Sequence, residues 1–188
     1  MPRIILASGS PRRRELLAKL YDKFDIITSE VDESFDGDIS PIQGVEMLAV
    51  RKGEAVAKAQ EYDAVVISSD TLVEIGGVPL GKPVSREDAY RMLGMLSGQY
   101  HNVHTGIAVH YKGRVVSGVA SARVKFKTLT DAEIYAYIDG GEPMDKAGAY
   151  AIQGEGGKFI EGYDGDFDTI MGLSVSLTKS LIERATND

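Results

Sequence analysis

The first residues of the chain predict a strand that turns directly into a helix. The apolar residues 4–6 lead through Ser8 and Ser10 to Pro11 and three arginines at positions 12–14. Proline suits the first turn of a helix because its missing N–H needs no partner there, and a serine before it caps free backbone N–H groups. We therefore expect a helix that begins at Pro11 with Ser10 as its N-cap.

This junction also carries the features of a phosphate site. Unpaired N–H groups at a helix start, the helix dipole and three arginines all favour an anion. An ordinary capped helix with a solvated basic face explains the same residues, so the sequence leaves both interpretations open. The pattern G-x-x-x-x-G-K-[ST] does not occur, which excludes a P-loop NTPase.

Apolar runs and helical patterns alternate along the chain, which indicates an α/β protein. The run at 64–67 is continuous rather than alternating, as in a strand covered on both faces. The length of 188 residues suits one domain, or two small lobes that share one core. Strands are expected at residues 4–6, 24–28, 64–69, 71–75, 78–80, 101–111 and 115–126, and later helices at 41–59, 85–96, 130–138 and 174–185.

Composition narrows the class of protein. The chain has no cysteine, which excludes disulfides and thiolate metal sites. It shows neither a signal-peptide pattern nor an apolar stretch of membrane length, so we expect a cytoplasmic protein with no membrane partner. A net charge of −7 argues against binding to a nucleic-acid polymer, although a small anion can still bind where positive charges converge.

Three residues are candidates for chemistry by their position alone. Asp70 is expected just beyond the end of the buried strand, where open α/β sheets place their ligands. There it would hold a divalent cation or take a proton from water, unless it is only a turn aspartate. Lys82, between a glycine and a proline, and Lys52, in a helix, are simply explained as solvated charges.

Taken together, five segments resemble those of the Maf family, the septum formation inhibitor-like nucleotide pyrophosphatases. The segments are ASGSPRR at 7–13, SDT at 69–71, GKP at 81–83, LSGQYH at 96–101 with Thr105, and DKAGAY at 145–150 with QG at 153–154. The resemblance implies one domain over residues 1–188 with a fold like that of the inosine triphosphate pyrophosphatases. In that fold an elongated mixed sheet has flanking helices, and two lobes surround a cleft.

The resemblance further implies hydrolysis of a nucleoside triphosphate to the monophosphate and pyrophosphate, with Mg²⁺ or Mn²⁺ as the cofactor. Asp70 matches the family's proton acceptor, and with Glu33 it would hold the metal and activate water. The phosphate-binding positions of the family correspond to Ser8, Arg13, Lys52 and Lys82.

Three further positions separate branches of the family: Arg12, Thr71 and Gln153. These side chains resemble the branch that acts on dTTP and UTP, and an amide at 153 can pair with the O4 and N3–H edge of uracil or thymine. Modified pyrimidine triphosphates fit the same interpretation. The alternatives are a 7-methyl-GTP or inosine triphosphate pyrophosphatase, and a non-enzymatic regulator of septum formation. The sequence leaves a homodimer open.

The chain departs from the family pattern near Lys52. Arg51 stands one place later than usual, and Gly53 replaces a common alanine, so the helix is expected to run differently there. Ser174 replaces a usual proline before the last helix, which it can cap equally well. The residues alone do not decide between Glu33 and its neighbour Asp32 as the metal ligand.

Overall fold

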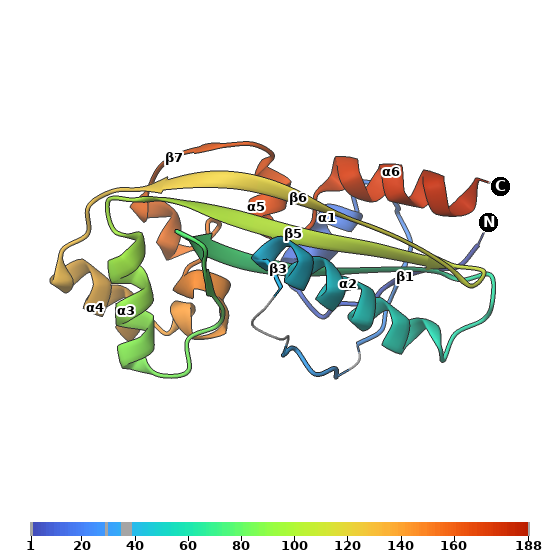
Figure 1. The fold of residues 1–188 in the computed structure, drawn as a ribbon, viewed down its shortest axis with the longest axis horizontal. Helices are drawn as coiled ribbons and strands as arrows, with labels where there is room; N and C mark the ends of the chain where they lie inside the picture. Colours follow the sequence, from blue (N-terminus) through green and yellow to red (C-terminus); the bar gives the residue numbers. More distant parts are fainter. Residues whose placement is uncertain (1, 29, 35–38, 188) are drawn as a thin grey trace. The chain divides into compact units, whose positions relative to one another are not determined.

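The computed structural model describes residues 2–28, 30–34 and 39–187. They form a mixed sheet with the strand order β2-β1-β3-β5-β6-β7, and β4 pairs with β3 only (Figure 1). The expected α/β class is confirmed. The strands are β1 (Ile4–Leu6), β2 (Asp25–Ile26), β3 (Val65–Ile75), β4 (Val78–Leu80), β5 (Tyr100–Tyr111), β6 (Arg114–Phe126) and β7 (Ile160–Asp164).

Helices connect most of these strands. The α-helices are α1 (Pro11–Leu17), α2 (Pro41–Ala57), α3 (Arg86–Leu96), α4 (Asp131–Asp139), α5 (Phe167–Met171) and α6 (Val175–Thr186). Three short 3₁₀ helices occupy the glycine-rich stretch: η1 (Glu142–Asp145), η2 (Ala147–Ala149) and η3 (Glu155–Phe159). Ser10 caps α1 and Ser174 caps α6, as expected.

The chain divides into two compact units. Unit 1 consists of Met1–Thr71, Thr105–Ala120 and Gly172–Asp188, and unit 2 of Leu72–His104 and Ser121–Met171. Two units agree with the two expected lobes, while the cleft and the single domain over residues 1–188 stay predictions. The long strands β3, β5 and β6 each contribute residues to both units.

In unit 1, β1 pairs in parallel with β2 and with the first residues of β3. Helix α2 runs unbroken through Gly53, so the altered residues around Lys52 do not change its course. A Cβ atom at Gly53 would collide with the side chains of Ser68 and His110. The glycine is therefore explained by the close approach of α2 to the sheet.

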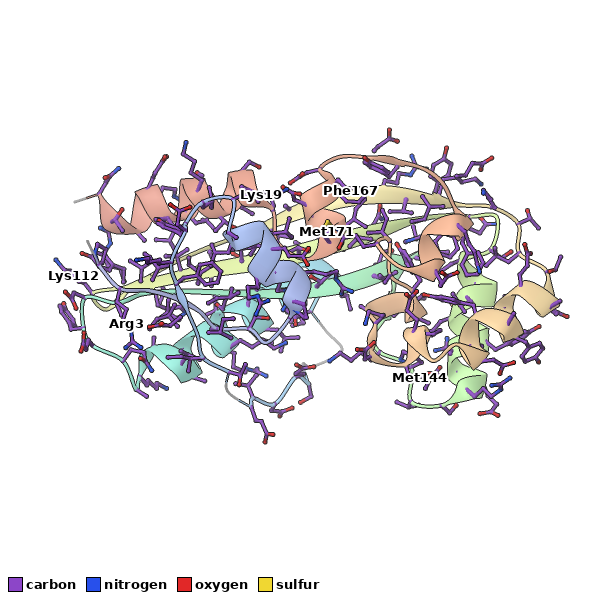
Figure 2. The ribbon with its side chains drawn as sticks, turned by 180° about the vertical axis from the view of Figure 1, so that it is seen from behind. Arg3, Lys19, Lys112, Met144, Phe167 and Met171 are labelled. Atoms are coloured by element: carbon purple, nitrogen blue, oxygen red, sulfur yellow. The ribbon has the colours of Figure 1, made fainter. Side chains whose placement is uncertain are left out.

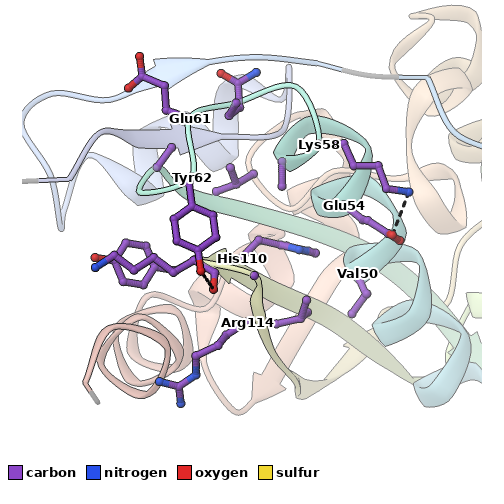
Figure 3. A pocket seen from close by; sticks show the side chains of 15 residues that line it. Val50, Glu54, Lys58, Glu61, Tyr62, His110 and Arg114 are labelled. Atoms are coloured by element: carbon purple, nitrogen blue, oxygen red, sulfur yellow. Dashed lines mark hydrogen bonds and ion pairs between the residues drawn. The ribbon is translucent and has the colours of Figure 1, made fainter.

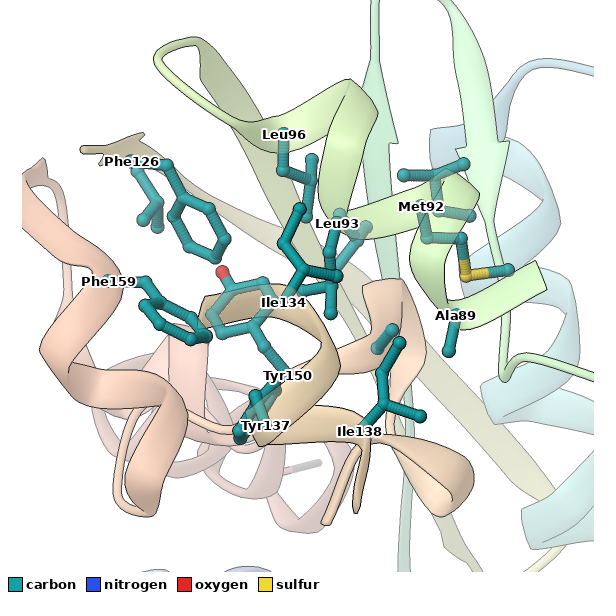
Figure 4. Close-up of a cluster of buried hydrophobic side chains, with 14 of the residues drawn as sticks. Ala89, Met92, Leu93, Leu96, Phe126, Ile134, Tyr137, Ile138, Tyr150 and Phe159 are labelled. Atoms are coloured by element: carbon teal, nitrogen blue, oxygen red, sulfur yellow. The ribbon is translucent and has the colours of Figure 1, made fainter. Parts of the chain in front are cut away.

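In unit 2, aromatic side chains fill much of the core, as Figure 4 shows. The ring of Phe126 meets that of Tyr150 edge to face at 4.8 Å, and Tyr137 meets Phe159 in the same way at 5.0 Å. Edge-to-face pairs of this kind stabilise a core beyond the area they bury. Helices α3 and α4 supply aliphatic side chains to this core, including Leu93 and Ile134, and the strands add others such as Val124.

Two expectations about strands are wrong. Strand β3 does not end before Asp70 but continues to Ile75, because its neighbours β5 and β4 extend the sheet past the end of β1. Asp70 therefore lies inside a strand, three residues after Ile67, where the pairing with β1 ends. Strand β2 is also shorter than residues 24–28. Strand β7 was not predicted, since the sequence IEGYD has no apolar alternation.

Candidate active site

Lys52 joins two carboxylates in unit 1. Its ammonium Nζ lies 2.5 Å from Asp70 Oδ1 and 2.8 Å from Glu33 Oε1. The side chains of Lys52 and Asp70 are only 17% and 15% exposed, whereas that of Glu33 is 53% exposed. Helix α2 and strand β3 thus hold a largely buried ion pair, with a second carboxylate on its solvent side.

Arg51 explains how Glu33 comes to this place. The Arg51 guanidinium donates to the backbone carbonyls of Asp32 and Ser34, at 2.5 and 3.0 Å. These two carbonyls bracket Glu33, so Arg51 holds the segment that carries it. The Asp32 carboxylate instead accepts from the Ser34 N–H at 2.9 Å. Of the two candidate metal ligands, Glu33 is the one that contacts Lys52.

Arg13 forms a second part of the site. Its guanidinium donates to the Thr71 hydroxyl at 3.1 Å, the Ser8 hydroxyl at 3.3 Å and the Gly172 carbonyl at 3.0 Å. Burial lowers the pKa of Arg13, partly offset by the charge of Asp70 and reinforced by that of Arg12. An arginine keeps its positive charge in this situation. Asp70 and Arg13 therefore share one electrostatic environment.

The backbone carbonyl of Gly172 holds the Arg13 side chain in place. It accepts from Arg13 Nε and also from the Ser69 hydroxyl, the latter at 2.6 Å. Gly172 directly follows Met171, the last residue of α5, which is labelled in Figure 2. Its φ of 112° lies in the region that favours glycine, and a Cβ atom would sit 3.3 Å from both Arg13 Nε and Thr71 Oγ1.

Sequence reasoning did not assign a role to Ser69, Thr105 or Gly172. Thr105 meets Thr71, with 3.1 Å between the two hydroxyl oxygens. The motifs contain Ser69 and Thr105, but a hydroxyl or a backbone carbonyl that supports another side chain gives no distinct signal in one sequence. The glycine at 172 was the available signal, since a glycine before a capped helix can mark a positive φ.

The structure brings together most of the predicted site residues. Those that meet in unit 1, directly or through one of the others, are Ser8, Arg13, Glu33, Lys52, Asp70 and Thr71. Arg12 lies beside Arg13 on α1.

Lys82 and Gln153 belong to unit 2, where both are exposed. The loop of Lys82 is tied to η2, because the Gly81 carbonyl accepts from the Gly148 N–H at 3.0 Å.

A pocket of about 530 Å³ lies elsewhere in unit 1, between the C-terminal half of α2 and the turn from β5 to β6 (Figure 3). Val50, Glu54, Tyr62 and His110 line it, together with Arg114. None of the predicted site residues is among the residues that line this pocket, so it is separate from the cluster around Asp70.

A polar network joins three strands of unit 2. His104 Nδ1 lies 2.7 Å from the Ser121 hydroxyl, and its Nε2 lies 3.5 Å from Glu74. Asn102 donates to the same Glu74 carboxylate at 2.9 Å. Because Glu74, His104 and Ser121 come from β3, β5 and β6, we expect this network to stabilise the sheet.

Comparison with solved structures defines the class of fold. A HAM1 protein from Coxiella burnetii aligns over 97% of this chain and 100% of its own, with a TM-score of 0.50 and 13% sequence identity. At this identity the likeness shows the fold alone. The mixed sheet with its helices is therefore of the HAM1 type, in agreement with the fold expected from the sequence motifs.

The chain belongs to the Maf family, because the model of that family, described as "Maf-like protein", matches residues 3–185. A dTTP/UTP pyrophosphatase from Bdellovibrio bacteriovorus is 44% identical over 97% of this chain and 98% of its own. Another, from Moorella thermoacetica, is 47% identical over 97% of this chain and 94% of its own. Among the described residues, no helix is long and apolar enough to cross a membrane.

Proposed function

We propose that this protein hydrolyses dTTP and UTP, and modified pyrimidine triphosphates, to the monophosphate and pyrophosphate. The observation that carries the proposal is the contact of Asp70 with Lys52, beside an Arg13 that is fixed by three hydrogen bonds. The names and the high coverage of the two pyrophosphatase relatives support the choice of substrate.

Arg13 and Ser8 bind phosphate oxygens in this proposal. A guanidinium can bind two such oxygens at once, and Arg13 is held in place before any substrate arrives. Such preorganised charge stabilises the transition state without a cost in reorganisation at the moment of reaction. Lys52 and Lys82 neutralise the charge on the pyrophosphate that leaves.

Asp70 accepts the proton of the attacking water. The water oxygen forms a bond to the α phosphorus, the bond from that phosphorus to the bridging oxygen of the β phosphate breaks, and pyrophosphate departs. The proton passes to the Asp70 carboxylate, which is an acceptor when ionised. Placement and charge stabilisation supply most of the catalysis in phosphoryl-transfer reactions.

The residues present fit a divalent cation. Oxygens of Glu33 and Asp70 converge on one positive charge, the Lys52 ammonium. Mg²⁺ is commonly held by one or two carboxylates together with phosphate oxygens and waters, so Glu33 and Asp70 would hold it or Mn²⁺. The described residues contain no cluster of three or more His, Cys, Asp or Glu side chains that could hold a metal, so this pair of carboxylates would share the cation with phosphate oxygens and waters. When bound, the cation would neutralise phosphate charge and activate water.

The base is selected by Arg12, Thr71 and Gln153 in this proposal. The amide of Gln153 offers one donor and one acceptor to the edge of uracil or thymine, whereas an ionised glutamate could only accept. Thr71 contacts Arg13 through its hydroxyl, so it connects the specificity residues to the phosphate-binding arginine.

The test is pyrophosphate release from a panel of nucleoside triphosphates with Mg²⁺ or Mn²⁺. We expect dTTP and UTP to be turned over preferentially, and Asp70→Asn to lower kcat by about a hundredfold or more. The matched control is Asp63→Asn, an exposed aspartate of the same unit, which should leave turnover unchanged. Preference for 7-methyl-GTP or inosine triphosphate would contradict the base assignment. No release from any triphosphate would favour the regulator.

A further inference from the structure

Gln153 lies in a segment of unit 2 whose backbone is held on both sides. The segment runs from Ala151 through Gly156, and Gln153 itself is exposed. Two side chains hold it: Tyr137 from α4 and Glu142 from η1. Neither residue was singled out by the sequence, because a tyrosine at helical spacing simply predicts core packing.

Glu142 binds the chain after Gln153. Its carboxylate accepts from the Glu155 N–H at 3.1 Å and from the Gly156 N–H at 3.0 Å. Burial raises the pKa of Glu142, but the hydrogen bonds from Tyr137, Gly156 and Glu155 outweigh this effect and lower it. The carboxylate is therefore ionised at neutral pH, which makes these hydrogen bonds charge-assisted.

Tyr137 binds the chain before Gln153. Its hydroxyl donates to the Glu142 carboxylate, and the hydroxyl oxygen accepts from the Ala151 N–H at 3.3 Å. The tyrosine is only 3% exposed, and its ring packs edge to face on Phe159 in the core (Figure 4). Tyr137 thus links the rigid core of unit 2 to both the segment and Glu142.

Glycines let the segment close on this pair. A Cβ atom at Gly154 would overlap the Glu142 carboxylate, and one at Gly156 would lie 2.6 Å from the Tyr137 hydroxyl. At Gly157 it would lie 2.6 Å from the Ile152 carbonyl oxygen. Contacts this short force a neighbour to move, so side chains at these positions would open the segment.

We propose that Tyr137 and Glu142 are positioning residues that hold Gln153 for recognition of the pyrimidine base. This inference rests on the proposed function, because it gives both residues a part in the selection of the pyrimidine base by Gln153. Gln153 must present a donor and an acceptor at fixed places to distinguish O4 and N3–H of uracil from the amino group and bare N3 of cytosine. Two anchors on either side of an exposed side chain provide that fixed geometry.

The test compares UTP with CTP in the full-length protein. Tyr137→Phe keeps the ring in the core and removes the hydroxyl that binds Ala151 and Glu142. We expect the ratio of kcat/KM for UTP over CTP to fall about tenfold, through a higher KM for UTP, with kcat at saturating UTP within about twofold. Tyr135→Phe is the matched control, because Tyr135 is an exposed tyrosine of the same helix and should keep the full ratio.

A double-mutant cycle separates positioning from general damage. Gln153→Ala alone should lower the UTP preference, and adding Tyr137→Phe should change it by less than about twofold, because Tyr137 acts on the preference only by placing Gln153. Glu142→Gln, which keeps one acceptor oxygen and turns the other into an NH₂ donor, should reduce the preference about threefold and keeps the inference testable if Tyr137→Phe does not fold.

Two results would overturn the inference in distinguishable ways. If Gln153→Ala lowers the UTP preference but Tyr137→Phe and Glu142→Gln do not, or lower kcat equally for both substrates, the positioning role is wrong and the proposed function stands. If Gln153→Ala itself leaves the preference unchanged, the base assignment of the proposed function fails, and the inference fails with it.

Discussion

In unit 1 the side chains around Asp70 hold one another, whereas in unit 2 the chain around Gln153 is held through its backbone. Lys52 pairs with Asp70 and Glu33 by charge, and Arg13 donates to Thr71 and Ser8. Around Gln153 the contacts end on N–H groups, and the side chain itself is exposed. Substitutions around Asp70 should therefore change the rate of reaction, and substitutions around Gln153 should change substrate preference.

The largest expected effect comes from Lys52→Met. Removing the ammonium leaves the Asp70 and Glu33 carboxylates without their shared partner. It also removes the positive charge that neutralises the leaving pyrophosphate in the proposed function. We expect kcat/KM for dTTP to fall by about a hundredfold to a thousandfold, as when one preorganised charge is lost from an active site. Steady-state kinetics measures it.

Lys58→Met is the control for this variant. Lys58 follows the same helix and is 72% exposed, with an ion pair to Glu54 four residues earlier. Its loss should leave kcat/KM unchanged. If kcat/KM falls equally in the two variants, the charge of Lys52 acts only at long range. The contact of Lys52 with Asp70 would then not explain the rate, which contradicts the comparison between the two regions.

The next effect concerns stability in unit 2. Burial lowers the pKa of His101 to about 4, since its ring is enclosed by Tyr150 and Phe126 in the core. As the pH falls, His101 therefore takes up a proton near pH 6.5 in the unfolded chain but only near pH 4 in the folded chain. The full stabilisation is present above pH 6.5 and is lost as the pH falls through this window, by about 3 kcal/mol.

Urea unfolding at pH values from 7.5 to 4.5 measures this loss. His110, whose pKa is also lowered by burial, adds a loss of the same sign from unit 1. His101→Gln should therefore reduce the pH dependence of the free energy of unfolding, and the contribution of His110 should remain. An unchanged slope in the variant would contradict the assignment to His101.

Gly172→Ala should affect both rate and stability. The φ of 112° strains any residue with a Cβ atom, at a cost of about 1–3 kcal/mol in the free energy of unfolding. The new methyl group would also press on Arg13 and Thr71, so we expect kcat/KM to fall about tenfold. Thermal unfolding and kinetics measure the two effects.

The smallest effect on the rate is expected for Gly53→Ala, which forces a methyl group against Ser68 and His110. Overpacking of this kind costs about 1–3 kcal/mol, and the neighbouring Lys52 should shift with the helix, lowering kcat about threefold. Gly94→Ala in α3 of unit 2 is the control for both glycine variants, because nothing lies within 4 Å of its new methyl group. It should raise stability by about 0.5–1 kcal/mol and leave kcat unchanged.

The sequence predicted the parts of this molecule that rest on local chemistry. The cap at Ser10 and the helix start at Pro41 follow from single residue types with few allowed conformations. The class of fold was predicted through the motifs. Contact of Asp70 with Lys52 joins residues 18 positions apart, and only the family resemblance suggested it.

What depends on distant neighbours was not predicted. Strand β3 continues past Asp70 because β5 supports it, and no local signal at residues 69–71 reports a neighbouring strand. The support of Arg13 by the Gly172 carbonyl spans 159 positions and uses only a backbone atom. Backbone groups are common to all residues, so a sequence cannot show which of them will serve a site.

The most direct test of the central claim is hydrolysis of dTTP in water enriched in oxygen-18, followed by mass spectrometry of the products. If water attacks the α phosphorus with Asp70 as the proton acceptor, one labelled oxygen appears in the monophosphate and none in pyrophosphate. Asp70→Asn should form little of either product. Label in pyrophosphate, or in free phosphate released beside the diphosphate, would contradict the account, because water would then attack a different phosphorus.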